Sequence, residues 1–134
     1  MTTKNLWPEF QLENVIRTPK AILNEQAEFL AKGTKNLLNG NITISSSRNG
    51  DIDYFFYIVA PNLGGYSYHL LRINHKTISM YPCVLFDSSN PKGYDIINED
   101  DLLDKLSEIF NSPQTQKVIT SLISQSIDEN TPSV

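Results

Sequence analysis

The chain has 134 residues, of which 40% are hydrophobic and 19% are charged, and its formal net charge at pH 7 is −4. This length and composition are typical of one folded domain with its own hydrophobic core. The Lys and Arg residues are scattered singly, so the chain lacks the basic stripe that binds nucleic acid or an anionic membrane. We expect neither partner.

The single cysteine, Cys83, excludes an internal disulfide and is typical of a reducing compartment. No segment approaches the roughly 20 consecutive apolar residues of a membrane helix. Residues 1–5 lack the apolar region of a secretory signal. The sequence therefore predicts a cytoplasmic protein.

The N-terminal part of the chain predicts an arm followed by a helix. Residues 1–17 contain apolar residues broken by Pro8, and we interpret them as an arm that packs against the body. Thr18-Pro19 combines a good N-cap with a residue favoured at the first helical position. Apolar residues then recur at helical spacing as far as Leu38, and Asn39-Gly40 predicts the end of the helix.

The central part predicts a four-stranded antiparallel meander. Asn49-Gly50 favours a two-residue hairpin loop. Further turns near 61–65 and 75–76 separate strands near 52–60, 66–74 and 78–86. The two-residue loop sets a register that pairs Arg48 with Asp51, Ile44 with Phe55, and Ile42 with Tyr57.

This register divides the strand residues between two faces, because directly opposed residues share a face. One set is almost wholly aliphatic and aromatic, and we expect the helices to cover it: Ile42, Ile44, Phe55, Tyr57, Val59, His69, Leu71, Ile73, Ile78, Met80 and Val84. The other set is rich in tyrosine, and we expect it to be only partly covered: Thr43, Ser45, Tyr54, Phe56, Ile58, Tyr66, Tyr68, Leu70, Arg72, Tyr81 and Cys83.

The last third predicts a loop and two helices. Residues 87–98 read as a turn-rich loop with room for a short edge strand near Tyr94. Asn98 caps one helix and Ser112-Pro113 begins another, while residues 128–134 form a polar tail that we expect to be disordered. The prediction is a single α+β domain over 1–134, with an N-terminal helix, the meander, and two C-terminal helices packed on one sheet face.

The residues that could carry chemistry have structural explanations. We interpret His69 as a core or boundary residue, His75 as a turn residue, and Cys83 as a buried thiol with no neighbour to activate it. Their spacing fits no metal-binding pattern, so we predict neither a metal nor a cofactor. Asp51 and Asp53 could hold a cation, but a charge pair with Arg48 explains them better. No feature of the sequence supports an enzymatic function.

The tyrosine-bearing set has the composition of a recognition surface, because Tyr and Arg are enriched at binding hot spots. We therefore predict a small non-enzymatic interaction protein that binds another protein, or a second copy of itself, through this face or the sheet edge. The alternatives are a small-ligand binder, with an aromatic pocket and Arg72 contacting an anionic group, and a minimal hydrolase using His69 or Asp53. The predicted binding residues are Tyr54, Phe56, Tyr66, Tyr68, Arg72 and Tyr81.

In size, acidity and helix-flanked sheet the chain resembles small bacterial accessory proteins such as immunity proteins and secretion chaperones. That resemblance implies a protein partner, and it carries no residue roles over to this chain. The element order departs from the secretion-chaperone pattern, which places a helix among the strands.

Overall fold

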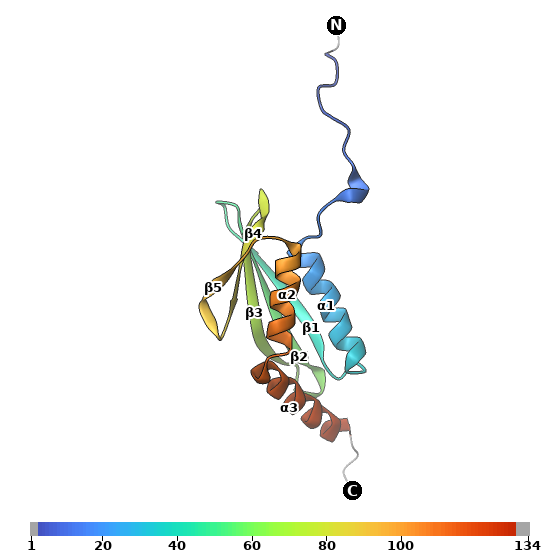
Figure 1. Ribbon diagram of the computed structural model, residues 1–134. Coiled ribbons are helices and arrows are strands. Elements are labelled where there is room, and N and C mark those ends of the chain that lie inside the picture. The colour runs from blue at the N-terminus through green and yellow to red at the C-terminus, as the bar shows by residue number, and fades with distance from the viewer. Residues whose placement is uncertain (1–2, 131–134) are drawn as a thin grey trace.

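The computed structural model describes residues 3–130 and has an α+β architecture, as the sequence predicts. One antiparallel sheet has its strands in chain order, and α1 and α2 lie side by side over the same face of it (Figure 1). The sheet has five strands rather than the predicted four. The elements are α1 (Pro19–Gly33), β1 (Asn39–Ser46), β2 (Asp51–Ala60), β3 (Tyr66–Lys76), β4 (Ser79–Asp87), β5 (Asn90–Ile96), α2 (Glu99–Phe110) and α3 (Pro113–Asn130), with short 3-10 turns at Leu12–Asn14 (η1) and Pro61–Leu63 (η2).

Helix α1 begins where the sequence predicts but ends earlier. The Thr18 hydroxyl accepts a hydrogen bond from the backbone N–H of Ala21 at 3.0 Å, which confirms the N-cap. At the other end Thr34 stops the helix, because its hydroxyl donates to Leu30 O at 2.9 Å and accepts from the backbone N–H of Leu38 at 3.1 Å. The predicted end at Asn39-Gly40 is therefore wrong.

Gly40 has a packing role in β1 instead of capping a helix. A Cβ added at this position would lie 2.7 Å from the Cβ of Ala27 and 2.9 Å from the ring of Phe56. Only a residue without a side chain lets α1 lie this close to the first strand.

The first hairpin has a three-residue loop, one residue longer than predicted. The backbone N–H of Ser47 donates to Asp51 O at 2.9 Å, and that of Gly50 donates to Ser47 O at 3.1 Å. Gly50 has φ +87°, the left-handed conformation that closes a type I turn with a bulge. The register therefore pairs Ile44 with Tyr54 instead of Phe55.

This shift of one residue corrects the predicted faces, because side chains alternate along a strand. In β2, the buried residues are Tyr54, Phe56, Ile58 and Ala60, and they lie under the helices. Phe55, Tyr57 and Val59 point to the other side, which we call the open face. The helices thus cover much of the tyrosine-bearing set, and not the face we expected.

A β-bulge in β3 adds a second correction. Phe56 pairs with Leu71 and Tyr57 pairs with His69, so Leu70 is an extra residue in the ladder. Both Leu70 and Leu71 are buried, at 8% and 0% exposure. The bulge places His69 on the open face but His75 on the helix-covered face, although the sequence gives both the same parity.

The last third of the chain forms strand β5 and helices α2 and α3. Strand β5 extends the sheet beyond β4, in the segment we predicted to be mainly a loop. The Asn98 side chain accepts from the backbone N–H of Asp101 at 2.9 Å, which confirms the start of α2. Helix α3 begins at Pro113, as predicted, and packs against η2 at one end of the sheet, where Asn62 donates to Ser126 O at 3.3 Å.

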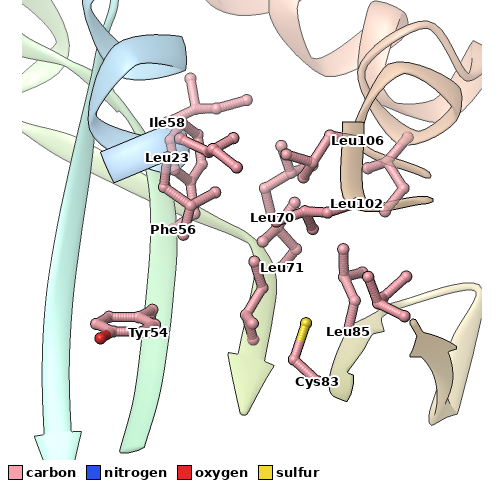
Figure 2. Packing of buried hydrophobic residues seen from close by; sticks show 14 of the residues in the cluster. Leu23, Tyr54, Phe56, Ile58, Leu70, Leu71, Cys83, Leu85, Leu102 and Leu106 are labelled. Atoms are coloured by element: carbon pink, nitrogen blue, oxygen red, sulfur yellow. The ribbon is translucent and has the colours of Figure 1, made fainter. Parts of the chain in front are cut away.

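The core lies between the sheet and the helices. Figure 2 shows apolar side chains from α1, β2, β3, β4 and α2 meeting there, with Cys83 among them. The fully buried members include Ile22, Leu23, Leu71, Ile73, Leu85, Ile96 and Leu102.

The N-terminal arm projects away from this core (Figure 1). Its large apolar side chains are 62–84% exposed in the described part of the arm, which does not fit the packing predicted for residues 1–17. The arm contacts the body at its last residue, Arg17, whose backbone oxygen accepts from the Tyr81 hydroxyl. At the opposite end, residues 128–130 continue α3, and the rest of the predicted tail lies outside the described residues.

Candidate functional site

The six residues predicted for binding do not form one surface. Tyr54 and Phe56 belong to the core, with 7% and 2% of their surface exposed. Tyr81 is half-buried on the same side, and its hydroxyl donates to Arg17 O at 3.3 Å. Burial also raises the pKa of Tyr81 to about 12, which keeps this hydroxyl protonated.

Tyr66 and Tyr68 lie together beside α3. They line a groove of about 500 Å³ with residues of η2 and α3: Leu63, Lys117, Val118, Ser121, Leu122 and Gln125. Arg72 lies on the opposite side of the sheet, so the structure separates it from every tyrosine of the predicted set.

The open face gathers a different group of aromatic residues. No helix or arm segment of the described chain lies over this side of the sheet (Figure 1). Its side chains are only partly buried by one another, whereas those on the opposite face are covered by helices. The residues that define the open face are Phe55, Tyr57, Val59, His69, Arg72, Val84 and Phe86.

Arg72 lies at the centre of this face, paired with Phe55 on one side and with Phe86 on the other. Its guanidinium carbon is 4.0 Å from the centre of the Phe86 ring, and its Nη1 donates to Asp53 Oδ1 at 2.7 Å. The same Asp53 oxygen accepts from Asn74 Nδ2 at 3.1 Å. The charge of Arg72 is thus matched by Asp53, and its guanidinium covers part of the Phe86 ring.

A second aromatic group lies beside Arg72 on the open face. The ring of His69 lies 5.7 Å from that of Phe55 and 5.2 Å from that of Tyr57, measured between ring centres. His69 itself is exposed, contrary to the core or boundary position we predicted. These three rings and the Arg72–Phe86 stack form a continuous aromatic surface across β2, β3 and β4.

Strand β5 leaves space for side chains of β4 at Gly93, on the open face. Gly93 has φ +94°, and a Cβ there would overlap a methyl group of Val84 and lie 2.9 Å from the Phe86 ring. Because Gly93 has no side chain, Phe86 and Val84 spread over the strand and widen the apolar patch.

The other candidates for chemistry are enclosed or already paired. His75 is 5% exposed rather than in a turn; its Nδ1 donates to Lys76 O at 2.8 Å, and no described residue bonds its Nε2. Cys83 is buried, and burial raises its pKa to about 12. Asp51 forms an ion pair with Lys76 at 2.7 Å instead of the predicted pair with Arg48. Among the described residues, no group of His, Cys, Asp and Glu has the arrangement of a metal site.

A separate apolar pocket lies on the helix side of the sheet. It has a volume of about 230 Å³ and opens between α1 and the junction of α2 with α3. Its lining includes Phe29, Phe56, Leu70 and Phe110, with the rings of Phe56 and Phe110 6.1 Å apart. Arg72 cannot serve this pocket, because the sheet lies between them.

Sequence reasoning missed Phe55, Tyr57, His69 and Phe86 as aromatic residues of the open face. The alternation in β2 was visible, but the choice of face depended on the length of one hairpin loop. Comparisons with family models, with curated proteins and with solved structures found no match to this chain. In the part of the chain that the structure describes, no helix is long and apolar enough to cross a membrane.

Proposed function

We propose that this protein is a non-enzymatic interaction module that binds another protein on the open face of its sheet. The observation that carries the proposal is the aromatic surface around Arg72, over which no described segment lies. Aromatic residues and Arg are the residue types enriched at the centres of protein interfaces. A protein partner is also what characterises the small bacterial accessory proteins that the chain resembles in size and acidity.

The charges of the open face restrict the kind of partner. Arg72 is already paired with Asp53, so a carboxylate from the partner would compete with an existing ion pair. An apolar or aromatic segment gains more, because it can lie on Tyr57 and Phe86 without displacing any charge. We therefore expect a partner that contributes hydrophobic side chains.

Two tyrosine variants test this proposal. Tyr57→Ser removes a ring from the open face, and Tyr66→Ser removes the same side chain from the helix side, where Tyr66 is 51% exposed. Each variant is compared with the parent protein in affinity capture from extracts of the source cells, after thermal unfolding has confirmed that it is folded. We expect Tyr57→Ser to lose a specifically captured protein and Tyr66→Ser to retain it. Loss with Tyr66→Ser alone would contradict the proposal.

A second candidate function is the binding of a small apolar ligand in the 230 Å³ pocket. The aromatic lining from Phe29, Phe56 and Phe110 favours it. A ligand that fits should raise the unfolding temperature by mass action. Ile119→Trp, which places a larger side chain at the pocket wall, should abolish that increase; an equal increase in the variant would argue against this site.

A further inference from the structure

The first strand of the sheet has an unprotected free edge. β1 pairs only with β2, and its sequence, NGNITISS, contains no charged residue and no proline. Exposed edges are usually blocked by such residues, because an unpaired strand otherwise recruits another one. The opposite edge strand, β5, does have them, since it carries Pro91, Lys92 and the left-handed Gly93.

The hydrogen bonding of the hairpin shows which backbone groups of β1 face outward. Ser47 N–H donates to Asp51 O, so Ser47 and Asp51 form a hydrogen-bonded pair. Such pairs alternate along an antiparallel ladder, so the odd-numbered residues of β1 bond to β2. The N–H and C=O groups of Gly40, Ile42, Ile44 and Ser46 therefore point away from the sheet.

We propose that two copies of this protein associate by pairing β1 with β1, antiparallel, around a two-fold axis at Thr43. An isologous contact requires a surface that complements itself, and this register meets the requirement along the whole strand. Ile42 of one copy faces Ile44 of the other, Thr43 faces Thr43, and Asn41 faces Ser45. Four pairs of outward-facing residues then exchange about eight backbone hydrogen bonds.

The side chains favour this register over the one with its axis at Ile42. An axis at Ile42 would leave Ser46 without a partner and would place Ile44 opposite Gly40. Ile44 is 50% exposed in the monomer, and an axis at Thr43 covers it with an isoleucine of the second copy. The absence of charge on β1 also favours a second copy, because identical charges would meet near the axis and repel.

The position of α1 is compatible with this arrangement. The helix approaches β1 most closely at Gly40, which would pair with Ser46 of the second copy. The two Gly40 residues would lie about 20 Å apart along the strands, because six residues separate their positions. The points where the two α1 helices come closest to β1 would therefore be well separated.

Association at β1 is independent of the partner proposed for the open face. It would join two sheets into one and place the two open faces on the same side of it. Loss of partner capture and loss of self-association are separate measurements, so either proposal can fail alone.

Disulfide formation tests the register directly. In the proposed pairing, Cys residues introduced by Thr43→Cys lie in a non-hydrogen-bonded pair with Cα atoms about 4.5 Å apart, within disulfide range. Those introduced by Ser45→Cys lie about 14 Å apart and cannot join. Cys83 is 2% exposed and does not interfere. We expect a covalent dimer on non-reducing gels for Thr43→Cys only. No dimer with Thr43→Cys, or equal amounts with both variants, would overturn the proposal.

Sedimentation provides a second test. Ile44→Lys places a charge at the free edge, whereas Ile78→Lys makes the same change at a position that is 97% exposed in the β3–β4 turn. The parent protein and Ile78→Lys should sediment as concentration-dependent dimers, and Ile44→Lys as a monomer. A parent protein that stays monomeric at every concentration, or dimerisation that survives Ile44→Lys, would overturn the inference.

Discussion

Arg72 stacks on Phe86 across neighbouring strands, with its guanidinium carbon 4.0 Å from the ring centre. The stack covers part of the apolar surface of the open face while Arg72 remains paired with Asp53 at 2.7 Å. Both Arg72 and Asp53 are partly exposed, with 32% and 25% of their side chains accessible, so solvent screens the ion pair.

These contacts predict a modest stability effect for Arg72. Arg72→Ala should lower the free energy of unfolding by about 1 kcal/mol, because it removes a cation–π contact and a screened ion pair. Arg72→Lys should retain part of the effect, since Lys keeps the charge but lacks the planar group. Urea denaturation measures both variants through the midpoint at constant slope. Equal midpoints for the parent protein and Arg72→Ala would show that the stack contributes nothing.

Gly40 and Gly33 form a matched pair of substitution sites. Gly40→Ala should destabilise the fold by about 1–3 kcal/mol, because the new Cβ meets Ala27 and Phe56 at 2.7 and 2.9 Å. Gly33→Ala, at the last residue of α1, meets no atom within 4 Å and should stabilise slightly. Thermal unfolding of the two variants distinguishes them. The same change in both would mean that α1 does not press against β1 at Gly40.

Trp7 reports on the arm, because it is the only tryptophan in the chain. Its side chain is 75% exposed, so its fluorescence should be that of an indole in water and should change little when the protein unfolds in urea. Trp7→Ala should leave the unfolding midpoint, followed by circular dichroism, unchanged. A blue-shifted emission that moves to the red on unfolding would instead place the arm against a folded surface.

The raised pKa of Cys83 predicts that the protein loses stability at alkaline pH. This pKa is raised by burial from 9.0 to about 12, so well below pH 9 the thiol is neutral in both folded and unfolded chains. Between pH 9 and 12 the unfolded chain releases this proton and the folded protein retains it. The free energy of unfolding should therefore fall as pH rises, by up to about 1.4 kcal/mol per pH unit from this group.

A cysteine variant isolates that contribution. Tyr81, whose pKa rises from 10.0 to about 12, adds its own effect mainly above pH 10. Cys83→Ala should therefore flatten the decline in stability most clearly between pH 9 and 10, whatever its effect at neutral pH. Identical slopes in the parent and variant would contradict a buried neutral thiol.

Local side-chain chemistry made the helix starts predictable. The side chains that cap the helices accept hydrogen bonds from backbone N–H groups three residues further on: Thr18, Asn98 and Ser112. Because both partners lie in one short segment, the local sequence is enough to predict the bond. The α+β class followed from the same local patterns. The end of α1 was missed because the Thr34 hydroxyl competes for the backbone, and the apolar spacing through Leu38 gives no sign of it.

The candidate site was harder to predict because it depends on register. Asn49-Gly50 fits a two-residue loop and also a three-residue loop with Gly50 in the left-handed conformation. The difference of one residue reverses which side of β2 is buried. The extra residue at Leu70 depends on pairing with another strand. The sequence allowed a short edge strand near Tyr94, but Pro91 and Gly93, which are typical of loops, hid the first half of β5.

The bulge at Leu70 makes β3 two half-strands whose side chains are out of phase. Deleting this one residue would restore simple alternation between Tyr66 and Lys76. Because His69 and Leu71 already pair with the neighbouring residues Tyr57 and Phe56, the deletion would leave Tyr66 and Tyr68 beside α3 and His69 on the open face. The extra residue thus lets His69 and Leu71, two residues apart in the sequence, lie on opposite faces of the sheet.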